Sequence, residues 1–542
     1  MTDFQATGLS RRDALRSAAT LPVAALTTVA LAEGAGAQSS AADRVFARGN
    51  HMVSGDTTLT GSTRVESGAR VTLAAGATLT IVGDFEAPTT TIFSGPGRVD
   101  LSRSRLLAVR PEWWGAVADD PRTDSHPGLT AALAAHPAIA LGSGSYFISQ
   151  TWEIDRSDRQ IHGIGGRSKD LRATRIVLVG ATGTVVRVGT ERDPGGINAS
   201  VTSIDMRRIE LVRSLAPRRT AVAATGLRLV HVLNSVFEDI RANEHEIGFS
   251  MSGVVHSFLR DCAAFRSITN GAADESFVGF ALTEPAPTTG ANNASIYLID
   301  CLASLGNAPK LSVSIGMQLQ GAFADTHVIR LETSAMAQGI VVDGRATTLS
   351  RARQRSGHLN LLIDAPVLDG CGRTGISVSG LAAGAAVEVR SPYIALSATG
   401  SVAIAARQTQ GAFDVIGGQA IGWPATDGGV AAIGLELDGA TGVTATRIKL
   451  VGFARPVVAR ATQQFDLTVS IAAERASDNA AIALTGCGGG YVRALLTGPH
   501  RVAVAADAAS RNVTIDTAGH GAATVIVDGT PRIPGNGRVA IG

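Results

Sequence analysis

Four carboxylates stand just before two short apolar segments that each begin with glycine. The pairs are Glu244 and Glu246 before Gly248, and Asp274 and Glu275 before Gly279. Glycoside hydrolysis uses two carboxyl groups, about 5 to 5.5 Å apart for retention and about 6.5 to 9.5 Å apart for inversion. One acid protonates the leaving oxygen while the other activates water or attacks the sugar. Carboxylates in pairs on neighbouring segments are the residue types that this chemistry would use.

Basic side chains suit a second chemistry, β-elimination from a uronate. This reaction needs a base for the proton next to the carboxyl group and a positive charge that neutralises the acid. Lys310, one of only three lysines, lies in a long loop before a further Gly-led segment. His245, Arg345 and Arg373 are candidates to bind or neutralise a uronate. We expect no cofactor for hydrolysis, whereas a lyase could use Ca²⁺.

The elements that must position these residues form a repeat. Short Gly-led segments recur between residues 226 and 437, and a second series of apolar segments lies between them. The apolar period is two, which indicates strands rather than helices. Such units, with insertions of variable length, are typical of coils that stack and share one core. The sequence therefore predicts an all-β chain whose body is a parallel β-helix.

Side chains in such strands point alternately inward and outward. The predicted inward columns are Phe249, Phe280, Met317, Ile340 and Ile376, and Met251, Leu282, Leu319, Val342 and Val378. A predicted outward column is polar and contains Ser252, Thr283, Gln320, Asp343 and Ser379. Stacked strands lie about 4.8 Å apart, so this stripe suits a hydroxyl-rich ligand, with Gln320 and Asp343 as candidate binding residues. An ordinary solvated sheet surface is the alternative.

Other recurring residues suit structural roles. One turn position is predicted to form a stacked column of Asp239, Asp261, Asp300, Asp364, Arg330 and Arg390. Cys262 and Cys301 occupy the next position, and we expect them to stack in the core as small hydrophobic side chains.

The segment before the repeat resembles a known family. Trp114-Gly115-Ala116 is followed by an Asp-rich loop, a predicted helix over 129–135 and a Gly144-Ser145-Tyr146 turn. This order resembles the pectate-lyase-like superfamily, which includes polygalacturonases and phage tailspikes. The resemblance implies a right-handed parallel β-helix, which we place at 111–542. The Thr-, Val- and Gly-rich segment before it predicts short strands broken by turns, so we expect a β-rich capping segment over 38–110.

The resemblance also bears on function. In polygalacturonases the catalytic carboxylates stand at or just before the start of this type of strand, which implies that role for Glu244, Glu246, Asp274 and Glu275. An exported enzyme that degrades a polysaccharide, by hydrolysis or by β-elimination, is thus the first hypothesis. The Asn-Thr-Asp motif of polygalacturonases is absent, so a non-catalytic protein of glycan binding or envelope assembly is the alternative. A homotrimer, common among tailspike-like relatives, is left open.

The N-terminus carries the three parts of an export signal in order. Ser10-Arg11-Arg12 resembles the twin-arginine motif, an apolar run covers 21–32, and Ala35-Gly36-Ala37 suits signal peptidase. We expect a signal peptide over 1–37 and a mature protein in the periplasm or outside the cell.

Composition excludes several partners. A net charge of +2 with only 17% charged residues argues against nucleic acid, because phosphate binding needs a clustered basic surface. No apolar stretch after the N-terminus is long enough to predict a membrane span in the mature chain. The four cysteines form no CxxC pair, so no metal site is predicted.

Overall fold

A computed structural model describes most of the chain from residue 44 onward. The described residues are 44–165, 173–180, 183–191, 200–214, 223–267, 276–285, 293–306, 313–345, 354, 359–398, 400–422, 432–473, 479–519, 524–534 and 537–541. The predicted signal peptide, Asp274, Glu275 and Lys310 lie outside them.

Nine short strands open the described chain and form three parallel sheets of three strands each. They are β1 (Arg44–Phe46), β4 (Thr63–Val65) and β7 (Phe85–Glu86); β2 (Gly49–Val53), β5 (Ala69–Leu73) and β8 (Phe93–Ser94); and β3 (Thr57–Thr60), β6 (Thr78–Val82) and β9 (Arg98–Asp100). Their alternating burial, as in β5, places Val71 and Leu73 in the core. Each strand pairs with its equivalent in the next coil, so this segment is itself a small solenoid.

One 3-10 helix and one α-helix follow, η1 (Pro111–Trp114) and α2 (His126–Ala135). The predicted helix over 129–135 is confirmed as the larger part of α2. Leu129, Ala132 and Leu133 bury the apolar face of α2 in the core. Among the described residues, there is no helix with the length and hydrophobicity that crossing a membrane requires.

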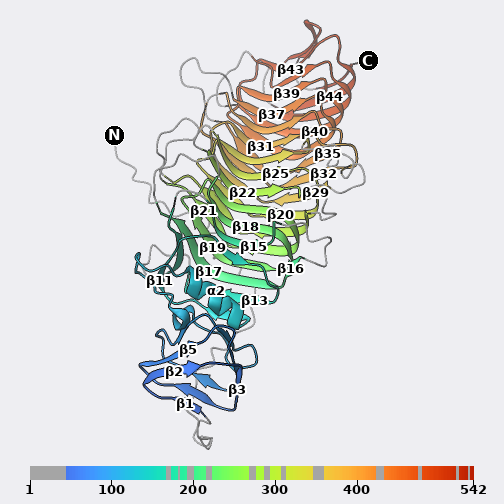
Figure 1. Cartoon of the computed structure of the whole chain (residues 1–542). Helices are drawn as coiled ribbons and strands as arrows, with labels where there is room; N and C mark the ends of the chain where they lie inside the picture. Colours follow the sequence, from blue (N-terminus) through green and yellow to red (C-terminus); the bar gives the residue numbers. More distant parts are fainter. Residues whose placement is uncertain are drawn as a thin grey trace, which may run out of the picture. The chain divides into compact units, whose positions relative to one another are not determined.

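The rest of the chain is a right-handed parallel β-helix, which confirms the predicted fold class. Successive coils pair in chain order, as the colours of Figure 1 show. Each coil contributes to three sheets, which we call A, B and C in the order in which the chain visits them. Sheet A holds β12 (Trp152–Ile154), β15 (Thr184–Gly189), the first parts of β18 (Thr225–Leu233) and β20 (Ile247–Arg260), β22 (Ser276–Thr283), β25 (Val313–Gln320), β28 (Gln338–Asp343), β31 (Thr374–Ser379), β34 (Val402–Arg407), β37 (Ile433–Asp438), β39 (Arg455–Arg460), β41 (Ile482–Thr485), β43 (Val502–Ala506) and β45 (Thr524–Val527).

Sheets B and C share several long strands that turn the corner between them. Sheet B holds β10 (Ala138–Ala140), β13 (Arg159–His162), β16 (Val201–Thr202), β23 (Asn293–Ile299), β26 (Phe323–Ile329), β29 (Leu359–Asp364), β32 (Ala386–Arg390) and β35 (Ala412–Ile416), with the last part of β20. Sheet C holds β11 (Gly144–Ile148), β14 (Thr174–Leu178), β21 (Ala263–Phe265), β24 (Leu302–Ser304), β27 (Glu332–Ser334), β30 (Val367–Cys371), β33 (Tyr393–Leu396) and β36 (Gln419–Ile421). Strands in both sheets are β17 (Ile204–Arg213), β19 (Val236–Asn243), β38 (Thr441–Val451), β40 (Gln463–Ala472), β42 (Gly488–Thr497) and β44 (Arg511–Gly519).

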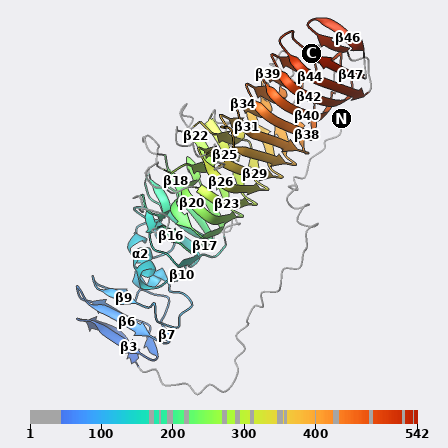
Figure 2. The ribbon, with the colours of Figure 1, turned by 90° about the vertical axis from the view of Figure 1, so that its right-hand side faces the viewer.

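The last two strands run against the others. β46 (Thr530–Pro534) pairs antiparallel with β45, and β47 (Gly537–Ile541) pairs antiparallel with β44. Figure 2 shows both beside the final coil. They end the parallel stack.

The predicted inward columns are confirmed. Phe249, Phe280, Met317, Ile340 and Ile376 pair in sequence along sheet A and are all buried. The rings of Phe249 and Phe280 stack with centroids 4.8 Å apart, which is the spacing of the coils. The second column, from Met251 to Val378, is buried in the same way.

From Arg208 to Arg447, the turn from sheet B to sheet C uses a residue with positive φ. These corner residues are Arg208, Asp239, Asp261, Asp300, Arg330, Ala365, Ser391, Gly417 and Arg447. The predicted column is therefore right for Asp239, Asp261, Asp300 and Arg330, and wrong by one residue for Asp364 and Arg390. Asp364 pairs with Ile329, and Arg390 pairs with Asp364, at the end of their sheet B strands and one position before the corner.

Candidate functional site

The connections between strands differ sharply around the coil. One connection, 163–173, joins β13 of sheet B to β14 of sheet C. From Arg208 onward the corner between sheets B and C is one or two residues long, and every long connection enters or leaves sheet A. Those that enter it are 214–224, 266–275, 305–312, 422–432 and 473–481, and those that leave it are 190–200, 284–292 and 344–358. Because binding residues concentrate where long connections meet a rigid scaffold, sheet A is the candidate functional face.

The outer surface of sheet A carries a polar stripe over three neighbouring coils. Its members on β20, β22 and β25 are Ser250, Ser252, Thr283, Gln318 and Gln320, all partly exposed. The strand pairing joins Thr283 to Gln320 and Gln320 to Asp343, so the predicted outward column is confirmed in register. Within the described part of the chain, the side chains of Ser250, Ser252, Gln318 and Gln320 make no hydrogen bond to another protein group. Their donors and acceptors are directed to solvent or to a ligand.

Charged groups continue the same face beyond the stripe, and they are paired with one another. Asp343 accepts hydrogen bonds from the backbone N–H and the Nε of Arg345, at 3.0 and 3.1 Å. Further along, Glu436 is nearly buried between the guanidinium groups of Arg407 and Arg460. This part of sheet A thus carries no unbalanced cluster of charge.

Two of the four catalytic candidates, Glu244 and Glu246, lie among the described residues, and each bonds to a neighbouring part of the fold. Glu246 Oε2 lies 2.7 Å from Arg213 Nη1 and accepts the N–H of Ala224 at 2.8 Å. The Arg213 side chain is only 3% exposed and that of Glu246 17%, so this is a buried ion pair. Glu244 has a positive φ and accepts hydrogen bonds from the N–H and hydroxyl of Ser267, at 3.0 and 2.6 Å. Both carboxylates join one coil to the next, and their catalytic role stays a prediction.

The predicted binding residues do not gather at one point. His245 is 1% exposed and its Nε2 lies 3.1 Å from the carbonyl oxygen of Leu211, so its ring faces the protein. Arg345 is half exposed beside Asp343 on the exit side of sheet A. Arg373 is exposed directly before β31. Of the predicted set, only Gln320, Asp343 and Arg345 share one region of sheet A.

Two residues with clear roles escaped prediction. Gln354 is fully buried in the connection 344–358, where its amide donates to the carbonyls of Gly321 and Gly344 and its oxygen accepts the N–H of Ala382. It anchors the longest exit connection, and no pattern around it signals burial. Gln318 lies in the other outward column of sheet A. The alternation of this column is visible in the sequence, but Gln318 pairs with Ala281, so the column does not stand out as polar.

The described residues contain no group of three or more His, Cys, Asp or Glu side chains that could hold a metal ion. All four cysteines are buried, free thiols. Burial, and then the neighbouring Cys301 thiol, raise the pKa of Cys262 well above its ordinary value. This thiol is therefore a core side chain and a poor metal ligand or nucleophile.

Comparisons with known proteins address the fold. No protein-family model and no curated protein sequence matches the chain. The N-terminal fragment of gene product 12 of bacteriophage Phi29 is similar in structure, with 13% identity over 81% of this chain and 74% of that one and a TM-score of 0.56. The tailspike protein of E. coli bacteriophage HK620, solved in complex with a pentasaccharide, has 12% identity over 78% of each chain and a TM-score of 0.57. At such identities the likeness shows the fold, and the chain is a right-handed parallel β-helix of the kind found in phage tailspikes.

Proposed function

We propose that this chain binds a polysaccharide along the outer face of sheet A, across β20, β22 and β25. The observation that carries the proposal is the stripe of Ser250, Ser252, Thr283, Gln318 and Gln320, whose polar groups repeat from coil to coil on the face that the long connections border. Hydroxyl and amide groups both donate and accept hydrogen bonds, as sugar hydroxyls do.

A repeating ligand suits a repeating surface. Each hydrogen bond contributes only about 0.5 to 1.5 kcal/mol, so useful affinity requires contacts on several coils at once. A polymer of sugars can make such contacts, whereas a single sugar cannot. The complex of the HK620 tailspike with a pentasaccharide is a precedent for this ligand class on a similar fold.

Cleavage of the bound chain is the second candidate function. Asp274 and Glu275 directly precede Ser276, the first residue of β22, and β22 carries Thr283 of the stripe. Hydrolysis requires two carboxyl groups, and in the sequence these two precede a strand of the proposed binding surface. A lyase mechanism would instead draw on a base such as Lys310, in the connection that enters β25.

One experiment separates these functions. The mature chain is incubated with neutral and acidic bacterial polysaccharides, while new reducing ends and the absorbance of unsaturated uronates are followed and binding is measured by affinity electrophoresis. Reducing ends alone indicate hydrolysis, both signals indicate a lyase, and retarded migration without either indicates binding only. An absence of retardation and of products with every polysaccharide would refute the proposal.

A matched pair of variants tests the carboxylates. Glu275→Gln is expected to lower any hydrolysis by orders of magnitude, because a catalytic acid or base contributes about 10² to 10⁴ in rate. Glu332→Gln, an outward residue of sheet C, is the control and should leave the rate unchanged. Equal rates for the two variants would exclude Glu275 from catalysis.

We also propose that residues 1–37 direct export by the twin-arginine route to the periplasm or beyond. Replacing Arg11 and Arg12 together by lysine should retain the full-length precursor in the cytoplasm. An unchanged distribution between cell fractions would contradict this route.

A further inference from the structure

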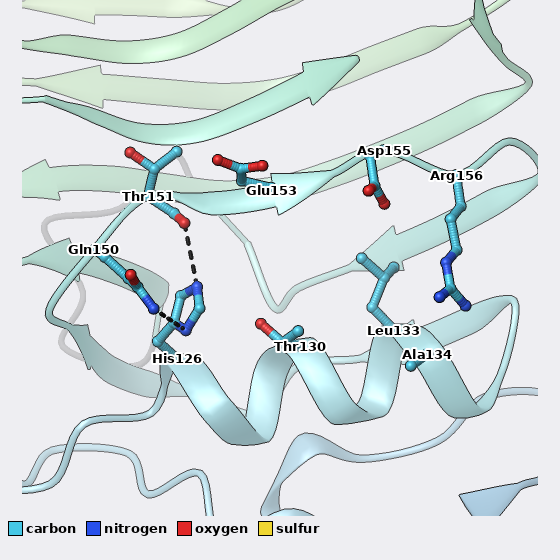
Figure 3. Close-up of a pocket in the computed structure, with 9 residues that line it drawn as sticks. All are labelled: His126, Thr130, Leu133, Ala134, Gln150, Thr151, Glu153, Asp155 and Arg156. Atoms are coloured by element: carbon cyan, nitrogen blue, oxygen red, sulfur yellow. Dashed lines mark hydrogen bonds between the residues drawn. The ribbon is translucent and has the colours of Figure 1, made fainter. Parts of the chain in front are cut away.

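A crevice of about 360 Å³ lies between α2 and the first strand of sheet A, β12 (Figure 3). It is lined by His126, Thr130, Leu133, Ala134, Gln150, Thr151, Glu153, Asp155 and Arg156. Small-molecule pockets span about 300 to 1,000 Å³, so the crevice has room for a ligand at the lower end of that range.

The two walls of the crevice differ in character. The helix wall presents the hydroxyl of Thr130 and the apolar groups of Leu133 and Ala134. The strand wall presents the side chains of Asp155 and Arg156 (Figure 3). Within the described residues these last two make no hydrogen bond that would occupy them. An apolar wall opposite free donors and acceptors is suited to a sugar ring, which has C–H groups on its faces and hydroxyls at its edge.

His126 fixes the mouth of the crevice. Its Nε2 lies 3.2 Å from the carbonyl oxygen of Thr151, which only accepts, so Nε2 carries the proton and donates. Its Nδ1 lies 3.1 Å from Gln150 Nε2 and accepts from that amide group. The Gln150 oxygen then stays available as an acceptor.

The charges of the crevice balance. Glu153 lies 2.5 Å from Arg187, and the same guanidinium lies 3.5 Å from Glu191. Asp155 is next to Arg156 in the chain. Among the described residues that line the crevice, no excess of positive charge is present to attract a uronate or a phosphate, so their chemistry favours an uncharged sugar.

The crevice continues the stripe on sheet A. The strand pairing joins Glu153 to Arg187, Arg187 to Arg228, and Arg228 to Ser250. The crevice thus stands at the head of the outward column that leads to the stripe, three coil steps or about 14 Å away. A glycan chain lying along the stack would bring its end to this point, where α2 closes the path.

We propose that this crevice is an end subsite, which binds one uncharged terminal sugar of the polysaccharide whose interior residues lie on the stripe. The inference rests on the proposed function and adds to it the class of sugar and the place where the glycan ends. Thr130, Gln150, Asp155 and Arg156 contact the sugar hydroxyls, and Leu133 packs against its ring.

The test uses the mature chain and a printed array of neutral and acidic bacterial oligosaccharides of graded length. Ala134→Trp fills the crevice from an exposed helix position, and Asp155→Asn alters one contact without adding bulk. Arg122→Trp, at a side chain that is 90% exposed outside the crevice, is the matched control.

Both crevice variants are expected to lose about tenfold or more in affinity for long neutral oligosaccharides and none for short ones. The control should match the unaltered chain. If both variants bind long neutral oligosaccharides normally while Gln320→Ala weakens them, the end subsite is refuted and the proposed function stands. A preference of the unaltered chain for acidic ends would also overturn the inference, and binding of no oligosaccharide would refute both proposals.

Discussion

The chain turns into the next sheet both at the corner between sheets B and C and at the borders of sheet A. The two kinds of turn differ in length and conformation. The corner spends one residue with positive φ in nearly every described coil, from Arg208 to Arg447. The borders of sheet A use as few as one residue in some coils and the whole of 344–358 in another. The corner between sheets B and C is thus fixed in geometry, whereas the borders of sheet A tolerate insertions.

The difference has a physical cause. A one-residue corner must keep the strands on both sides in register, and its left-handed conformation suits Gly, Asn and Asp far better than β-branched residues. A coil contacts only its neighbours, so an insertion that leaves the coil on one side disturbs no other part of the stack. Variation, and with it the capacity to build a site, therefore accumulates at the borders of sheet A.

The largest expected effect tests whether a border residue is structural. Glu246→Ala should lower the free energy of unfolding by about 3 kcal/mol or more, because it removes the carboxylate that faces the buried guanidinium of Arg213. The midpoint of urea denaturation measures this loss. Glu388→Ala, which breaks the exposed pair with Arg390, is the control and should cost about 1 kcal/mol or less. Similar midpoints for the two variants would show that Glu246 is free for another role.

The next effect probes the corner itself. Asp300→Val should lower the free energy of unfolding by about 1 to 2 kcal/mol, because valine is strained at a φ of 55°. Asp300→Asn keeps a residue that tolerates this conformation and removes only the exposed ion pair with Arg330, so it should cost less. Thermal denaturation compares them, and equal melting temperatures would contradict the argument about the corner.

A smaller effect is expected at the stripe, on binding and not on stability. Gln320→Ala should weaken polysaccharide binding about five- to tenfold, since it removes hydrogen bonds that contribute about 1 to 1.5 kcal/mol. Gln419→Ala, on sheet C, is the matched control and should bind normally. Parallel losses in both variants would mean that sheet A has no special role.

The smallest effect concerns pH. Burial tends to raise the pKa of Asp124, but hydrogen bonds from the Ser149 hydroxyl and from the His126 and Ser149 N–H groups outweigh it and hold the pKa below 3.8. A depressed pKa means that the carboxylate stabilises the fold above its unfolded pKa and loses this contribution as the pH falls through the folded value. Asp124→Asn should therefore melt earlier than the unaltered chain at neutral pH, and the gap should close in acid below about pH 3.8. A gap that is constant with pH would contradict this role.

The fold could be predicted from the sequence because alternation is a local property. Phe249 and Phe280 occupy equivalent positions on two neighbouring coils. Their inward position follows from the alternation of side chains along a strand. The corner was misplaced at Asp364 because this residue has the same type as Asp261 and Asp300, whereas the residue with positive φ is Ala365. No polar pattern marks an alanine as the corner residue.

The site was harder to predict because its partners come from different coils. Arg213 and Glu246 are far apart in sequence and meet because the end of β17 and the start of β20 belong to neighbouring coils. Gln354 is buried through contacts with three turns that no periodicity relates. The crevice between α2 and β12 went unnoticed because a helix and a strand of different period form it.

The two antiparallel strands at the C-terminal end have a consequence for how the protein behaves in a crowded solution. The last coil of any parallel stack exposes a row of backbone groups on which another chain could add by the same pairing, and repeated addition would give a fibre. β46 and β47 occupy that row in the reverse direction, and β46 contains Pro531 and Pro534, which have no N–H to offer a newcomer. The antiparallel pair therefore hinders the addition of a further parallel coil beside β44 and β45.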